Sequence, residues 1–146
     1  MTKAKFLDRQ LPVGVFKEQV SIKTAIFSRG KSAIDIWGIS EDNALLIFEL
    51  KAEQNDKVGI ISEIYFYANV MRLVKNGNFG YEKPCTNNLE LISQVSKIEA
   101  YILAPSLHPL IDRKLIETMD ICTQPEIEIH YISFNLGSTM HLNQEF

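Results

Sequence analysis

The first half of the chain alternates between apolar and polar residues in short runs. Residues 20–27 and 32–39 change character at every second position and are rich in β-branched side chains, a pattern that predicts β-strands. The polar residues 28–31 between them predict a turn. Residues 44–51 are apolar on both faces until the end of the run, which is typical of a central strand covered on both sides. This half is therefore expected to supply three consecutive strands.

The second half mixes helical and strand patterns. Residues 58–75 predict a long helix, with Gly77 placed as the residue that follows its C-terminus. Residues 96–104 and 126–134 alternate as strands, the last of them apolar on one side only. Between these two strands a helix is expected to begin at Pro109, because proline is tolerated in the first helical turn, and to end near residue 119.

The ends of the chain are less regular. Residues 3–10 are interpreted as a helix that ends at the following Leu-Pro-Val-Gly, and the tail from Gly137 is expected to be loose. The resulting order is helix, three strands, helix, strand, helix, strand. It predicts an α/β fold with a mixed central β-sheet flanked by helices, formed by a single domain over residues 1–146.

Composition narrows the class of protein. Hydrophobic residues make up 46% of the 146 residues and charged residues 23%, as in ordinary globular domains. The N-terminus has charges where a signal peptide needs an apolar run, and no run is long enough to span a bilayer, so a cytoplasmic protein is expected. The net charge of −3 argues against non-specific binding of nucleic acid by overall charge. The cysteines Cys85 and Cys122 and the scattered histidines form no zinc-binding motif, and two free thiols are expected.

Charged residues interrupt the apolar strands at three positions. Asp35 lies in the middle of one strand, and Glu49 and Lys51 lie at the end of the next. An isolated charge in such a place is costly unless it is paired or bound to a metal. If the intervening turn consists of residues 41–43, Asp35 lies directly opposite Glu49, with Cβ atoms about 4.5–5.5 Å apart. A turn of two or four residues without a bulge would place Asp35 on the other face of the sheet.

Two facing carboxylates suit a divalent cation. Magnesium is bound by one or two carboxylates, with water and substrate phosphate completing its ligands. A bound cation would polarise a phosphoryl oxygen and lower the pKa of bound water. Lys51 would then orient or help to deprotonate the attacking water and neutralise the charge that develops on phosphorus.

Asp35 followed by Glu49-Leu50-Lys51 at the end of the next strand, and then by a helix, resembles the PD-(D/E)XK motif of restriction-endonuclease-like nucleases. The resemblance covers residues 20–134 through the order of elements. It implies a restriction-endonuclease-like fold and a magnesium or manganese ion bound by Asp35, Glu49 and the Leu50 carbonyl. Lys51 matches the catalytic lysine of the family.

Two positions depart from the family pattern. Ile34 precedes Asp35 where the motif name has proline, and the acidic residue that the family takes from its first helix is not identifiable. Glu63, on the helix after the motif, is the candidate to replace that acidic residue in the catalytic site. The purely structural alternative is a salt bridge of Lys51 with Glu49 or Asp35. For Glu63 it is a role in capping the helix, or pairing with Lys57 or with a neighbouring subunit.

Basic residues near the motif are candidates for binding nucleic acid. Arg29 and Lys31 precede Asp35, and Lys57 follows the motif, so each is positioned to contact the phosphate backbone. Each is also a residue type that is commonly only solvated.

Two functions from different classes follow from these features. The first is a metal-dependent nuclease that hydrolyses the phosphodiester bonds of nucleic acid, with DNA as the expected substrate. A homodimer is expected because the helix over residues 58–75 is apolar on nearly all sides and one small domain offers little surface to a duplex. The alternative is a catalytically inactive relative that serves as a nucleic-acid-binding or protein-interaction module. The intact trio favours the enzyme, and the acidic pI of about 5.6 favours the inactive module.

Overall fold

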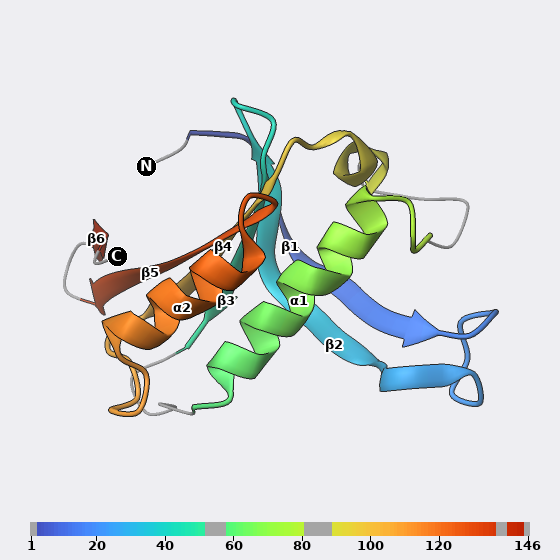
Figure 1. The fold of residues 1–146 in the computed structure, drawn as a ribbon, viewed down its shortest axis with the longest axis horizontal. Helices are drawn as coiled ribbons and strands as arrows, with labels where there is room; N and C mark the ends of the chain where they lie inside the picture. The colour runs from blue at the N-terminus through green and yellow to red at the C-terminus, as the bar shows by residue number, and fades with distance from the viewer. Residues whose placement is uncertain (1–2, 52–57, 81–88, 137–139, 145–146) are drawn as a thin grey trace.

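A six-stranded β-sheet with two α-helices forms the fold (Figure 1). The structure is a computed structural model, and it describes residues 3–51, 58–80, 89–136 and 140–144. The elements in chain order are β1 Ala4–Phe16, β2 Ala25–Ser40, β3 Leu45–Leu50, α1 Ile60–Lys75, the 3₁₀-helix η1 Leu89–Gln94, β4 Ile98–Ala104, α2 Arg113–Thr123, β5 Ile127–Leu136 and β6 Met140–Gln144. The expected α/β class with a mixed sheet is confirmed.

The strands lie in the sheet in the same order as in the sequence, from β1 to β6. β1, β2 and β3 are antiparallel neighbours, β3, β4 and β5 are parallel neighbours, and β6 is antiparallel to β5. A parallel connection needs a crossover, and α1 and α2 supply the two crossovers β3–β4 and β4–β5. The carboxyl end of β3 and the beginning of α1 therefore lie at the same edge of the sheet.

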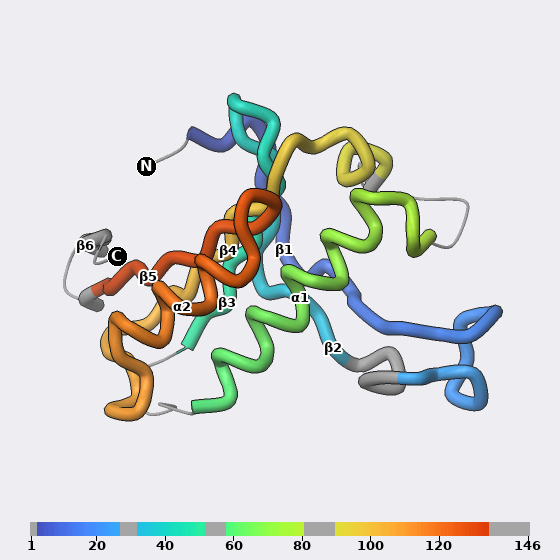
Figure 2. Tube along the Cα trace, in the orientation of Figure 1, coloured from blue at the N-terminus to red at the C-terminus, as the bar shows by residue number. Residues whose placement is uncertain are grey.

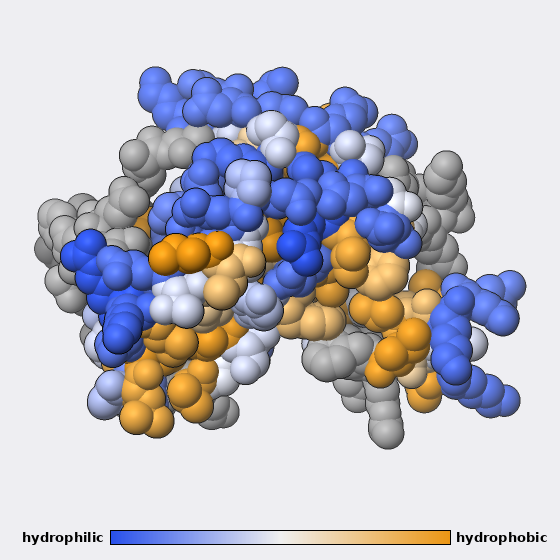
Figure 3. Space-filling view, viewed as in Figure 1, coloured by the Kyte–Doolittle hydropathy of each residue, from blue (hydrophilic) through white to orange (hydrophobic). Residues whose placement is uncertain are grey.

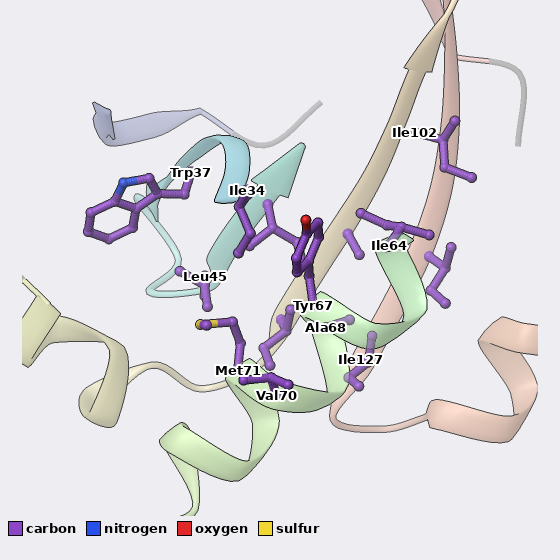
Figure 4. Close-up of a cluster of buried hydrophobic side chains, with 14 of the residues drawn as sticks. Ile34, Trp37, Leu45, Ile64, Tyr67, Ala68, Val70, Met71, Ile102 and Ile127 are labelled. Atoms are coloured by element: carbon purple, nitrogen blue, oxygen red, sulfur yellow. The ribbon is translucent and has the colours of Figure 1, made fainter. Parts of the chain in front are cut away.

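Both described helices pack on one face of the sheet. The main core joins α1 and α2 to residues of the strands, and Figure 4 shows Tyr67 of α1 beside Ile34, Met71 beside Leu45 and Ile64 beside Ile102. The opposite face carries a smaller cluster formed by Leu46, Phe48, Tyr101, Leu103, Ile132 and Phe134. The alternation of these two sets along β3, β4 and β5 is the alternation of side chains in a strand.

The N-terminal third differs from the sequence interpretation. The helix expected over residues 3–10 is wrong, since these residues belong to β1. The strand expected over residues 20–27 is mostly the connection between β1 and β2, and residues 28–31 lie inside β2. The physical reason is tertiary pairing, because β1 completes the sheet along β2 and buries Leu11 and Val13 in the main core. β1 is the edge of the sheet, where a proline such as Pro12 costs little hydrogen bonding.

The turn between β2 and β3 is as predicted. The paired residues run from Ile36 opposite Phe48 to Ile39 opposite Leu45, and Ser40 N donates to Ala44 O at 2.9 Å. The turn thus consists of residues 41–43, and Asn43 has a positive φ of 62°, a conformation that asparagine tolerates well. The register from which the facing of Asp35 and Glu49 was inferred is therefore confirmed up to Ile36.

The remaining elements match the pattern with shifted boundaries. α1 ends as expected, with Gly77 at φ 74° after the helix. α2 begins at Arg113 rather than at Pro109, because Asp112 caps it by accepting a hydrogen bond from Leu115 N at 2.8 Å. The tail expected to be loose contains β6, which pairs with β5.

Candidate metal centre

Asp35 lies at the end of the β2–β3 ladder. Its Oδ2 atom accepts a hydrogen bond from Leu50 N at 3.0 Å, one residue beyond the position directly opposite. This bond draws the Asp35 carboxylate to the carboxyl end of β3, where Glu49 also lies. The backbone N–H of Leu50 serves to hold Asp35, and the Leu50 side chain is 42% exposed.

Glu49 lies on the helix-covered face of the sheet, and Asp35 lies near it. Trp37 and Ile39 on β2 and Ile47 on β3 all belong to the main core beneath α1. Since side chains alternate along a strand, Ile47 places Glu49 on that face. Ile34 also belongs to the main core, so alternation along β2 does not place Asp35, and the hydrogen bond from Leu50 N is what holds it near Glu49. The negative charge of Asp35 also raises the pKa of Glu49. Both carboxylates therefore act on the same small region beside α1.

Lys51 connects the sheet to α1 through two ion pairs. Its Nζ atom lies 2.9 Å from Oε1 of Glu49 and 2.7 Å from Oε2 of Glu63. Glu63 is in the first turn of α1, the helix that follows β3 in the chain. The four residues expected to be catalytic are thus gathered at one edge of the sheet. Burial by itself lowers the pKa of Lys51, but the hydrogen bonds to Glu63 and Glu49 outweigh burial and raise it.

Only one of the two carboxylate oxygens of Glu49 accepts a hydrogen bond from a described residue. The residue is 5% exposed, and its Oε2 atom is buried without a hydrogen-bond partner among the residues that the structure describes. Burial is the main reason that its pKa rises from 4.5 to about 7, with the charge of Asp35 adding to the effect and the hydrogen bond from Lys51 opposing it. A buried oxygen without a partner costs roughly 1–3 kcal/mol. A cation or a proton bound at this oxygen would remove that cost.

Two further side chains lie at the site without any signal in the sequence pattern. Gln10 of β1 donates from Nε2 to Oδ1 of Asp35 at 3.3 Å, and its φ of 55° is unusual for a residue other than glycine. Tyr67 of α1 has its pKa raised by burial and by the charge of Glu49, against the effect of a hydrogen bond with Ser32. Gln10 was missed because it lies on the segment interpreted as a helix, and Tyr67 because it lies on a helix that is apolar on nearly all sides.

The structure gives less information on the predicted nucleic-acid-binding residues. Lys57 lies outside the described residues. The pairing of β2 with β1 jumps from Ser32 opposite Val13 to Phe27 opposite Val15, so residues 28–31 form a large bulge. Arg29 and Lys31 therefore lie on a bulge of β2 a few residues before Asp35. Bulges are common beside active sites, where they redirect side chains.

The donor set fits a hard divalent cation that retains water ligands. Among the described residues, no set of three or more His, Cys, Asp or Glu side chains could hold a metal ion. The set inferred from the sequence has two carboxylates and one backbone carbonyl, and magnesium typically uses one or two carboxylates. The unpaired Oε2 of Glu49 beside Asp35 is the observation in this structure that such an ion would satisfy.

The chain shows no significant match to a protein-family model, a curated protein or a solved structure. No helix in the described part of the chain has the length and apolar character that a membrane span requires. A function must therefore be argued from the chemistry of the site.

Proposed function

We propose that this protein is a divalent-metal-dependent nuclease of the PD-(D/E)XK type, with a restriction-endonuclease-like fold. It would hydrolyse phosphodiester bonds of nucleic acid with magnesium or manganese bound by Asp35, Glu49 and the Leu50 carbonyl. The observation that carries the proposal is the buried, unpartnered Oε2 of Glu49 next to a second carboxylate and an ammonium group. A purely structural Glu49–Lys51 ion pair explains Oε1 but leaves Oε2 without a role.

The residues of the site have different chemical roles in this proposal. A divalent cation at the carboxylates supplies Lewis acidity toward a phosphoryl oxygen and a more acidic bound water. Lys51 has a raised pKa, so its amine is protonated at neutral pH. It therefore acts by donating hydrogen bonds and by neutralising charge that develops on the phosphate, rather than as a general base. Glu63 holds the Lys51 ammonium from the side of α1, and Gln10 orients Asp35.

The arrangement of elements supports the same proposal. An antiparallel β2–β3 hairpin followed by α1 and the parallel strand β4 has the order that the family resemblance implies. The N-terminal segment is a strand, so no preceding helix in the described chain supplies an acidic residue. Glu63 of α1 is the acidic residue that reaches Lys51 instead.

The alternative of an inactive nucleic-acid-binding or protein-interaction module has one observation in its favour. Lys51 forms ion pairs with both Glu49 and Glu63. In such a module the three charges would stabilise the junction of β3 and α1 and nothing more. The two functions differ in whether the carboxylates bind a divalent cation, and that difference can be measured directly. The homodimer expected from the sequence stays a prediction, which light scattering during size-exclusion chromatography would test.

The decisive experiment is calorimetric titration with Mn²⁺ of the wild type, Asp35→Asn and Glu117→Gln. Asparagine can still accept the hydrogen bond from Leu50 N, so the fold is retained while a charge is lost. Glu117 lies on α2, paired with Arg113, and serves as the matched control. We expect at least tenfold weaker Mn²⁺ binding for Asp35→Asn and unchanged binding for the control. Equal affinities in all three proteins, or no binding by the wild type, would refute the metal site.

Catalysis is tested by cleavage of labelled duplex and single-stranded oligonucleotides in Mg²⁺ or Mn²⁺. Lys51→Met is expected to retain Mn²⁺ binding and to lose cleavage, because methionine keeps the length of the side chain without its charge. Metal binding by a wild type that cleaves no nucleic acid would favour the inactive module.

A further inference from the structure

The β1–β2 hairpin extends beyond the sheet as a two-stranded arm. β2 pairs with β3 between Ile36 and Ile39, whereas Ala25, Phe27 and Ser32 of β2 pair with β1 alone. Figure 1 shows this outer part of the hairpin, residues 14–31, projecting away from both helices, and Figure 2 shows the chain turning back at its tip. This projecting part is called the arm below. A two-stranded ribbon on its own is only marginally stable in water, so a surface is expected to support the arm in its working state.

The tip of the arm is fully accessible and carries an unusual mixture of side chains. Lys17 and Lys23 are exposed, and Val20, Ile22 and Ile26 are 53%, 78% and 60% exposed. On the face shown in Figure 3, the outer end of the arm is hydrophilic, and hydrophobic side chains gather where the arm joins the body. Basic side chains around exposed apolar ones are suited to a polyanion that also offers an apolar surface.

The arm is basic in an otherwise acidic protein. Residues 17–31 contain four basic residues and one acidic residue, a net charge of +3, whereas the whole chain carries −3. Two of these basic residues, Arg29 and Lys31, lie on the bulge of β2 that leads to Asp35. The positive charge of the chain is thus concentrated along one ribbon, and that ribbon begins at the candidate metal centre.

We infer that the arm lies in a groove of B-form DNA and holds the duplex across the metal centre. This inference rests on the proposed nuclease function and names its substrate class. The major groove of B-form DNA is about 12 Å wide and admits a two-stranded β-ribbon, whereas the major groove of duplex RNA is too narrow for side chains to read. A single strand offers no groove at all. Lys17 and Lys23 contact phosphates beside the groove, and Val20 and Ile22 at the tip contact sugars and base edges.

A second copy of the chain is a less suitable occupant of the arm. The whole chain carries a net charge of only −3, whereas duplex DNA carries one negative charge per roughly 1.7 Å of helix axis. The positive charge concentrated along the arm therefore favours the nucleic acid substrate itself.

The test measures binding in EDTA, where no cleavage takes place. Fluorescence anisotropy is recorded for a labelled DNA duplex of about 30 base pairs, the same single strand and the matching RNA duplex, at several salt concentrations. The variants are Lys17→Glu/Lys23→Glu at the tip and the control Lys5→Glu/Lys114→Glu, which changes net charge equally at exposed positions outside the arm. We expect the DNA duplex to bind best and the tip variant to bind it at least tenfold more weakly than the control variant. The slope of log K against log salt should fall by about 2, for two lost phosphate contacts.

A second variant, Val20→Ser/Ile22→Ser, tests the apolar tip without changing charge. It should weaken duplex binding severalfold and leave the oligomeric state unchanged. Equal weakening by the tip and control charge variants, equal binding of single strand and duplex, or conversion of a dimer to a monomer by the serine variant would overturn the inference. Because the assay contains no divalent ion, its result is independent of Mn²⁺ binding. The arm inference and the metal-site proposal can therefore fail separately.

Discussion

Replacing Glu49 by glutamine removes the negative charge of this side chain and keeps its size and shape. The pKa of Glu49 is about 7 in the folded protein against 4.5 as the ordinary value, with burial as the main cause. Each pKa unit corresponds to about 1.36 kcal/mol, so the full shift costs the folded state about 3 kcal/mol once Glu49 is ionised in both states. The cost is large beside the total stability of a small domain, about 5–15 kcal/mol.

The direction of the pH effect follows from which state binds more protons. Between pH 4.5 and 7 the folded protein holds the Glu49 proton and the unfolded chain releases it. Stability therefore falls as pH rises through this window, and it levels off above the folded pKa. With these two pKa values, the contribution of Glu49 to the free energy of unfolding drops by about 2.5 kcal/mol between pH 5 and pH 8. Glu49→Gln has no such proton to lose.

Urea denaturation in EDTA at pH 5 and pH 8 measures the effect. The difference in unfolding free energy between the two pH values is compared for wild type, Glu49→Gln and the control Glu117→Gln, so constant effects of each substitution cancel. The wild type and the control should lose about 2.5 kcal/mol more than Glu49→Gln over this range. If all three proteins show the same pH dependence, Glu49 does not have a raised pKa and the account of its unpartnered oxygen is wrong. Saturating Mn²⁺ should instead stabilise the wild type at pH 8, because a ligand that binds the folded state raises its stability.

Three other substitutions test separate parts of the structure. Gln10→Gly should keep the unfolding free energy within about 1 kcal/mol of the wild type, because relief of the positive φ offsets the larger entropy of the unfolded chain. The same substitution should weaken Mn²⁺ binding in calorimetry, because Asp35 loses a hydrogen bond. Unchanged affinity would show that Gln10 does not position that carboxylate. Gly38→Ala should destabilise the fold by about 2 kcal/mol or more in thermal denaturation, because its Cβ would overlap the backbone oxygen of Phe6; full stability would mean that β1 does not pass there. Asp112→Ala should cost about 1 kcal/mol in urea denaturation through loss of the α2 cap, and no change would exclude that role.

The gathering of Asp35, Glu49 and Lys51 could be predicted from local patterns. The polar residues 41–43 set the length of the turn, and the length of the turn sets which residues of β2 and β3 face each other. The apolar run of β3 places Glu49 and Lys51 at its end, and the alternation of side chains places them on one face. These features depend on residues close in sequence, whose spacing is visible without any knowledge of the rest of the chain.

Tertiary structure alone decided the role of the segments whose partners are distant in sequence. Residues 3–10 were interpreted as a helix because their own pattern is ambiguous, and only pairing with β2 makes them part of a strand and brings Gln10 to Asp35. β6 likewise forms by pairing with β5. The contact of Glu63 with Lys51 depends on how α1 packs over the sheet. Whether Oε2 of Glu49 has a hydrogen-bond partner depends on which groups the packed interior brings near it. No single stretch of the sequence determines this.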